Sequence, residues 1–164
     1  MIFRLSIKFA LILFLGNFSA SGQWTKKEAR FWQKKMNTSF KSDRTSPLEE
    51  CQRVKFKRLP FYRINKKLAI NASWMRCNDS SWFEMETTTN RRPIYRRFAK
   101  LSFYHKGEKY SITAFQPQKL HNEKGYENYL FIPFGDATNG HKTYGGGRYV
   151  EVNFTNADFL LLDF

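Results

Sequence analysis

The sequence has few acidic residues and no apolar run long enough to cross a bilayer. It contains 14 Asp and Glu residues against 28 Lys and Arg residues, so its formal net charge is +14 at pH 7. A basic excess of this size favours an anionic partner such as an acidic polymer, a lipid head group or nucleic acid. A membrane-spanning helix needs about 20 apolar residues, so we expect no transmembrane segment.

Cysteine is also scarce, since the chain has only Cys51 and Cys77. They form no Cys-x-x-Cys pair, and the three histidines are scattered, so the sequence predicts neither a metal site nor a cofactor. In an oxidising compartment the two thiols can form one disulfide. Because the sequence does not give the distance between their Cα atoms, Cys51–Cys77 is a candidate disulfide and the fold does not require it.

Recognisable catalytic motifs are missing as well. There is no Gly-x-Ser-x-Gly turn, and neither cysteine stands in a nucleophile motif. Residues 135–143 (GDATNGHKT) come close to a phosphate-binding P-loop, but His141 separates the second glycine from the lysine, and glycines follow where a helix is needed. Nucleotide hydrolysis is therefore not expected.

The first 22 residues have the pattern of a signal peptide. Arg4 and Lys8 precede a short apolar run over residues 9–15, and small residues follow at 20–22. This order is typical of an export signal with cleavage after Gly22. We expect an exported protein, periplasmic or secreted, whose residues 23–164 form a single mainly β domain, and export argues against nucleic acid as the partner.

Two helices are predicted near the start of this domain. Residues 24–40 carry apolar side chains at helical spacing, with lysines on the other faces. Residues 46–55 begin with Ser46, Pro47 and Glu49, which are typical of an N-cap, a first turn and a capping box.

From residue 68 onward the apolar pattern changes to the two-residue period of strands. No helix of crossover length separates the predicted strands, so the sheet should be antiparallel. The predicted fold class is therefore α+β, mainly β, with one or two short helices before a partly closed barrel or a sandwich. The seven predicted strands cover residues 68–74, 82–88, 95–104, 110–115, 129–134, 148–152 and 159–164.

The segment from residue 130 to 152, LFIPFGDATNGHKTYGGGRYVEV, is the best candidate for a functional site. Many polar groups stand between two strands, and each needs a hydrogen-bond partner. Three glycines let another group approach the main chain, and the planar fork of Arg148 suits carboxylate or phosphate. The candidate ligand-binding residues are Asp136, Thr138, Thr143, Tyr144, Gly145, Gly146, Gly147 and Arg148.

Three interpretations of this segment are open. In the first, Arg148 anchors an anionic small molecule or an acidic envelope polymer. In the second, the chain is a hydrolase that uses Asp136 with His141, or with groups from a C-terminal segment that this chain lacks. In the third, it is a structural or interaction module that binds acidic polymers through a basic face, and Asp136 and Arg148 merely brace a long loop.

The same segment resembles a bacterial and archaeal family of unknown function, DUF1684. That family has a Pro-Phe-x-Asp-x-Thr-x-Gly-x-x-Thr-Tyr-x-x-Gly-Arg-Tyr signature, which residues 133–149 match in order. Weaker support comes from ARFWQKKM, from SPL at 46–48 and from FKRLPFY at 56–62. The resemblance implies no established activity.

The resemblance also raises an expectation about the C-terminus. Members of the family continue beyond the Leu-Asp-Phe that corresponds to residues 162–164, with a segment rich in Asn, Tyr, Pro and Cys. FLLLDF is an apolar strand at the very end of this chain, where polar residues are usual. We therefore expect a member of the family that lacks its C-terminal segment, and with it groups that could complete a site.

Overall fold

A computed structural model describes residues 25–164 of the chain. The predicted signal peptide, residues 1–22, lies outside the described residues. The chain divides into two compact units, and the second unit begins at Lys67. No helix among the described residues has the length and apolar character needed to cross a membrane.

The first unit contains the helix α1 (Lys26–Lys41). It begins two residues later than the sequence pattern suggested, because Thr25 is its N-cap. The Thr25 hydroxyl accepts a hydrogen bond from the Glu28 N–H at 3.2 Å, and the Glu28 carboxylate accepts one from the Thr25 N–H at 3.0 Å. This capping box satisfies two of the backbone donors that the first turn leaves unpaired.

The second helix of this unit, α2 (Glu50–Lys55), is shorter than predicted, and Ser46 is not its N-cap. The Ser46 hydroxyl donates to the Phe40 carbonyl at 2.7 Å and accepts from the Leu48 N–H at 3.1 Å. It is therefore used to close the turn after α1. Glu49 takes the N-cap position and has its own capping box.

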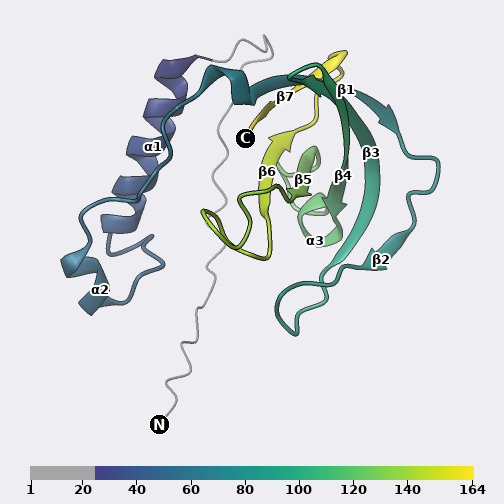
Figure 1. The fold of residues 1–164 in the computed structure, drawn as a ribbon. Coiled ribbons are helices and arrows are strands. Elements are labelled where there is room, and N and C mark those ends of the chain that lie inside the picture. Colours follow the sequence, from purple (N-terminus) through teal and green to yellow (C-terminus); the bar gives the residue numbers. More distant parts are fainter. Residues whose placement is uncertain (1–24) are drawn as a thin grey trace. The chain divides into compact units, whose positions relative to one another are not determined.

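The second unit is a seven-stranded antiparallel sheet, and all seven predicted strands are present (Figure 1). Neighbouring strands in the sheet follow the order β6-β5-β4-β3-β1-β7. The short strand β2 is not part of this order and pairs with β3. Two short helical segments, η1 (Lys66–Leu68) and α3 (Gln118–His121), were not predicted. The strands are β1 (Ala69–Arg76), β2 (Trp82–Glu84), β3 (Ile94–His105), β4 (Glu108–Pro117), β5 (Tyr129–Phe134), β6 (Arg148–Asn153) and β7 (Phe159–Asp163).

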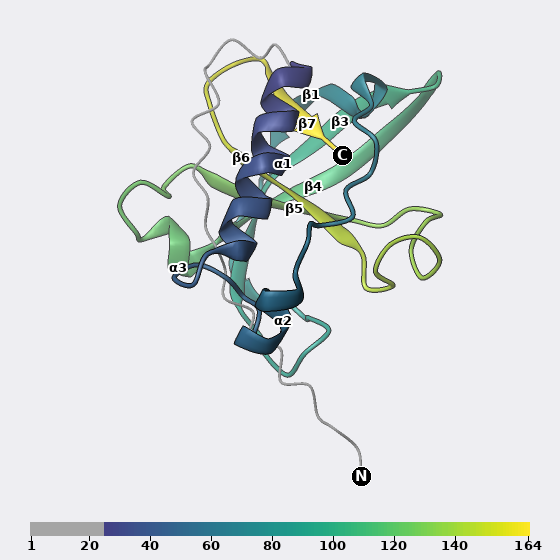
Figure 2. The same ribbon diagram turned by 90° about the vertical axis from the view of Figure 1, so that its left-hand side faces the viewer.

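The sheet curves so far that its two edge strands, β6 and β7, come into contact (Figures 1 and 2). The result is a mainly β, nearly closed barrel, which confirms the predicted fold class and decides it in favour of the barrel. The barrel interior is filled by alternate strand residues, as a two-residue period requires. These are Ala72, Phe98, Ala99, Leu101, Phe103, Ala114, Leu130, Ile132, Val150, Leu160 and Leu162.

Two backbone features set the direction of the longest strands. Lys106 and Gly107 connect β3 to β4 with φ of 51° and 85°, the positive values of the tight turns that suit hairpins. A bulge between Arg97 and Ala99 then shifts the register of the same pair. It brings Phe98 and Ala99 into the core together, and the residues after it alternate regularly between the interior and the outer surface.

Candidate functional site

The candidate loop, residues 135–147, joins the end of β5 to the start of β6. Register pairs Phe134 with Arg148 across these strands. Cross-strand partners on one face are close neighbours, and the Arg148 guanidinium accordingly lies 4.8 Å from the centre of the Phe134 ring. The hairpin itself thus fixes the position of the arginine against an aromatic surface.

Asp136 lies at the start of the loop and makes a turn of its own. Its Oδ1 accepts from the Thr138 N–H at 2.8 Å and from the Thr138 hydroxyl at 2.5 Å, the arrangement of an Asx turn. Its Oδ2 accepts from Nη2 of Arg148. The two Thr138 donors, and after them the Arg148 charge, hold the pKa of Asp136 below its ordinary value of 3.8.

The middle of the loop is folded onto Thr138. The Thr138 carbonyl oxygen accepts hydrogen bonds from the N–H groups of His141, Lys142 and Thr143 at 3.1, 2.9 and 3.1 Å. The Thr138 hydroxyl also lies 2.9 Å from that of Thr143. The polar groups that made this segment conspicuous therefore satisfy one another to a large extent, as buried or crowded polar groups must.

At two of the three glycine positions the backbone geometry explains why the residue is glycine. Gly147 has φ of 96°, and a Cβ on it would lie 3.0 Å from the Phe134 carbonyl oxygen. At Gly146 a Cβ would come within 2.6 Å of the Tyr144 ring and 2.8 Å of the Thr88 methyl group. Only glycine permits the first conformation without strain and the second close approach.

A shallow cavity of about 350 Å³ opens beside this turn. The backbone N–H groups of Gly145 and Gly146 and the side-chain amide nitrogen of Asn139 donate no hydrogen bond within the described part of the chain. Nε of Arg148 is buried and has no partner there either. The cavity is lined by Pro133, Phe134, Gly135, Asn139, Gly145, Gly146, Gly147 and Arg148.

The eight residues predicted for the site therefore divide into two groups. Gly145, Gly146, Gly147 and Arg148 line the cavity. Asp136, Thr138 and Thr143 lie in the neighbouring turn and reach the cavity only through the Asp136–Arg148 ion pair. Tyr144 has 68% of its surface exposed and is not among the residues that line this cavity.

Sequence reasoning missed the other half of the lining, Pro133 to Gly135 and Asn139. Phe134 and Arg148 are the last and first residues of the predicted strands 129–134 and 148–152, so a hairpin of these two strands could have suggested that they pair. Asn139 could not be found in this way. Its role depends on the turn in which its side-chain oxygen accepts from the Asp136 N–H at 2.9 Å.

Two contacts that a catalytic arrangement could use are not seen among residues 25–164. No hydrogen bond there joins His141 to Asp136, and no group of three metal-binding side chains is found. Both cysteines are free thiols, so the candidate disulfide Cys51–Cys77 is not formed in this structure.

The arginines before the β3 bulge do not make one basic face. Neighbouring strand residues point to opposite sides of a sheet. Arg96 accordingly donates to the Gln116 side-chain oxygen at 2.9 Å, while the Arg97 guanidinium lies 4.8 Å from the centre of the Phe83 ring. Charge that looks clustered in the sequence is thus divided between the two sides of the sheet.

Fold and loop together define a mainly β, nearly closed barrel with a glycine-lined cavity beside an ion-paired arginine. The chain belongs to the family described as protein of unknown function (DUF1684), whose model matches residues 54–164. The matched part includes the whole sheet and the loop.

The chain is similar in structure to a protein that has been solved experimentally. The similar structure is the solution NMR structure of an uncharacterized protein of Haloarcula marismortui, which is 26% identical, with a TM-score of 0.60. The similarity covers 84% of this chain and 74% of that protein. No curated protein matches the chain. The comparisons therefore identify the family and the fold and assign no activity.

Proposed function

We propose that this protein is exported and that it binds an anionic ligand, a carboxylate or a phosphate, at the cavity beside Arg148. The observation that carries the proposal is the set of donors around the cavity. Two glycine N–H groups and the Asn139 amide lack partners within residues 25–164. These residues line the same cavity as Arg148, so the cavity offers donors to an anion, and Asp136 is the acceptor that already binds one of the Arg148 donors.

The ion pair with Asp136 leaves Arg148 able to bind a ligand. A guanidinium has five N–H donors, and Asp136 accepts from Nη2 only. The side chains of Arg148 and Asp136 are 31% and 42% exposed, so the pair is accessible to solvent. In this arrangement Asp136 orients the guanidinium, and the ligand uses the donors that Asp136 leaves.

Proteins often bind anions with a combination of backbone N–H groups and an arginine guanidinium. Hydrogen bonds to a charged group contribute about 1.5–3 kcal/mol each, and a Kd of 1 mM corresponds to about 4 kcal/mol. Because association also costs free energy, millimolar binding of a simple anion needs several such contacts acting together, as the donors around the cavity would provide. A larger ligand would add contacts with the Phe134 ring.

Titration of the ¹⁵N-labelled protein with inorganic phosphate and with acetate tests this proposal. We expect saturable shifts of the Gly145 and Gly146 amide resonances in the wild type at millimolar anion. Arg148→Gln, which removes the charge and keeps a polar side chain, should weaken binding by at least tenfold. Arg92→Gln is the matched control, because Arg92 is also an exposed arginine in an ion pair, with Glu86 at 3.2 Å.

Three results would count against the proposal. The first is no saturable shift at the glycine amides. The second is equal binding by the wild type and a folded Arg148→Gln variant. The third is equal weakening by both substitutions together with loss of binding in high salt, which would indicate non-specific attraction to a basic protein.

Export has a separate test. When a tagged full-length chain is produced in a bacterium, the mature protein should be recovered from the periplasm or the medium with Gln23 as its first residue. Replacement of Arg4 and Lys8 by Glu should leave the uncut chain inside the cell, because it removes the positive start of an export signal. Efficient export of that variant would contradict this part of the proposal.

A further inference from the structure

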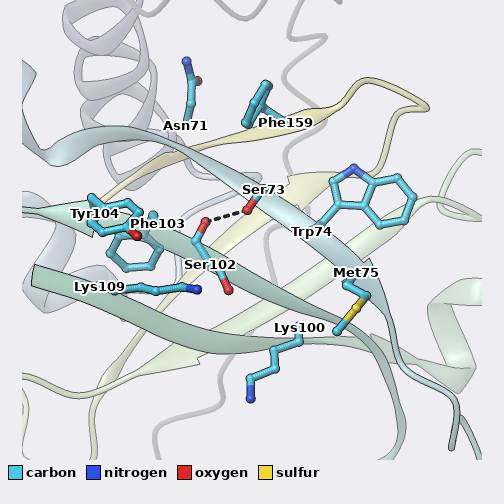
Figure 3. A pocket seen from close by; sticks show the side chains of 10 residues that line it. All are labelled: Asn71, Ser73, Trp74, Met75, Lys100, Ser102, Phe103, Tyr104, Lys109 and Phe159. Atoms are coloured by element: carbon cyan, nitrogen blue, oxygen red, sulfur yellow. Dashed lines mark hydrogen bonds between the residues drawn. The ribbon is translucent and has the colours of Figure 1, made fainter.

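A second cavity lies on the outer side of the sheet, on β1 and β3 and their neighbours β4 and β7 (Figure 3). Its volume is about 540 Å³, within the range of about 300–1,000 Å³ that is typical of ligand sites. It shares no residue with the cavity beside Arg148. We call it the β1–β3 groove.

The centre of the groove is polar. Asn71 and Ser73 on β1 and Ser102 on β3 point away from the core, because their neighbours Ala72 and Leu101 point into it. The Ser73 hydroxyl donates to the Ser102 carbonyl at 3.1 Å. A surface of hydroxyl and amide groups favours a ligand with hydroxyl groups of its own.

The borders of the groove are apolar and unusually exposed. Tyr104 on β3 is 68% exposed, Phe159 on β7 is 57% exposed and Met75 on β1 is 68% exposed. Large apolar side chains that gather at one exposed place often mark a binding surface. Aromatic rings on either side of a polar strip can stack against the flat faces of ring-shaped ligands.

Two lysines complete the groove. Lys100 lies on β3, and Lys109 lies on β4, opposite Tyr104 in the register of the two strands. Neither lysine forms an ion pair within the part of the chain that the structure describes. In Figure 3 Lys109 reaches toward Ser102, whereas Lys100 lies beside Met75. No acidic residue is among those that line the groove.

We infer that the β1–β3 groove binds an acidic carbohydrate, that is, a chain of sugars carrying carboxylate or sulfate groups. The polar strip would bind sugar hydroxyls, Tyr104 and Phe159 would stack on sugar rings, and Lys100 and Lys109 would pair with the acidic groups. An acyl chain fits poorly, because it would cover Asn71, Ser73 and Ser102 without satisfying their polar groups. A neutral sugar would leave both lysines unused.

Binding of four defined probes to the full chain tests the inference by calorimetry. The probes are an oligogalacturonide, a sulfated oligosaccharide, a neutral oligosaccharide of equal length and polyglutamate of equal charge. We expect at least one of the two acidic glycans to bind at least tenfold more tightly than the neutral glycan and than polyglutamate. Arg148→Gln should leave this binding unchanged, which separates the groove from the loop site.

Two variants with matched controls locate the site. Lys100→Gln/Lys109→Gln should weaken acidic-glycan binding at least tenfold, whereas Lys119→Gln/Lys124→Gln, which removes two exposed lysines outside the groove, should weaken it less than threefold. Tyr104→Ser/Phe159→Ser should weaken glycan binding at least fivefold and leave polyglutamate binding as it was. Tyr62→Ser, which alters an exposed tyrosine outside the groove, should change neither.

The inference is overturned by any of three outcomes. Neither acidic glycan binds, or polyglutamate binds as tightly as the acidic glycans, or the two double lysine variants weaken binding equally. The last outcome would mean that only the net charge of the protein matters.

Discussion

The loop beside Arg148 and the β1–β3 groove acquire their form in opposite ways. The loop is shaped by local hydrogen bonds, in which Asp136 and Thr138 satisfy their neighbours and hold Arg148 in an ion pair. The groove is shaped by strand register alone, and its lysines are held by no acid among the described residues. A site of the first kind is preorganised, and a site of the second kind is exposed and adaptable.

This difference predicts where the two sites are sensitive. Substitutions of Asp136 and Thr138 in the loop should change the stability of the fold, because the polar groups of these two residues have structural partners. Substitutions of the outward-facing polar and charged residues of the groove should change binding alone, because these side chains contribute little to the core; Phe103 and Trp74, which also line the groove, pack in or against the core. The predictions that follow test this contrast, from the largest expected effect to the smallest.

The largest effect is expected for Gly147→Ala. At φ of 96° an alanine is strained, and its Cβ would lie 3.0 Å from the Phe134 carbonyl oxygen. A residue held in such a region costs about 1–3 kcal/mol, so the free energy of unfolding in urea should fall by that amount. Gly145→Ala is the control, since a Cβ there would meet its nearest atom at 3.8 Å, and it should change stability little. Equal stability of both variants would contradict the structure of this turn.

The next effect is expected for Asp136→Ala, which removes the acceptor of both Thr138 hydrogen bonds and the partner of Arg148. Net contributions of about 0.5–1.5 kcal/mol per hydrogen bond give about 1–3 kcal/mol for the two Thr138 bonds, and because Asp136 is partly exposed we expect a loss in the lower half of this range. Asp136→Asn keeps the Oδ1 acceptor and removes the charge, so it should lose less. If the two variants are equally stable, the ion pair rather than the turn holds the loop.

The sequence predicts the strands of this protein better than it predicts its turns and short helices. The two-residue alternation predicted all seven strands, because a strand with one buried side alternates in this way, and the lack of crossover helices between them predicted the antiparallel sheet. Neither pattern could show that Ser46 would bind the Phe40 carbonyl instead of capping α2, since that contact depends on how the chain turns after α1. The short helix α3 was missed because four residues carry no periodic pattern.

The two candidate sites show the same division. A dense polar run drew attention to Asp136 and Arg148, and the structure joins them. Tyr144 was conspicuous for the same reason and is exposed instead. The groove was overlooked because each of its residues is ordinary at its own position. Only the register of β1 with β3 brings Ser73 opposite Ser102 and Met75 opposite Lys100.

A smaller effect is expected from pH. The pKa of Asp136 is lowered in the folded state, chiefly by the Thr138 hydroxyl and N–H and further by Arg148. The unfolded chain therefore takes up a proton first as pH falls, and the stability that Asp136 contributes, present above its ordinary pKa of 3.8, is lost below that value. The free energies of unfolding of the wild type and of Asp136→Asn, measured between pH 2 and 7, should differ at neutral pH and converge in acid. A difference that stays constant over this range would show that the carboxylate charge is not involved.

The smallest effect on stability is expected in the groove. Lys100 and Lys109 are exposed and belong to no ion pair among residues 25–164, and surface substitutions of this kind usually change stability by less than about 0.5 kcal/mol. Lys100→Gln/Lys109→Gln should thus unfold at nearly the same urea concentration as the wild type. Leu101→Ala, between Lys100 and Ser102 but completely buried, should lose about 2–5 kcal/mol. If the double lysine variant were destabilised by more than about 1 kcal/mol, these lysines would be part of what holds the sheet together. The contrast between a structural loop and a groove that is free to bind would then fail.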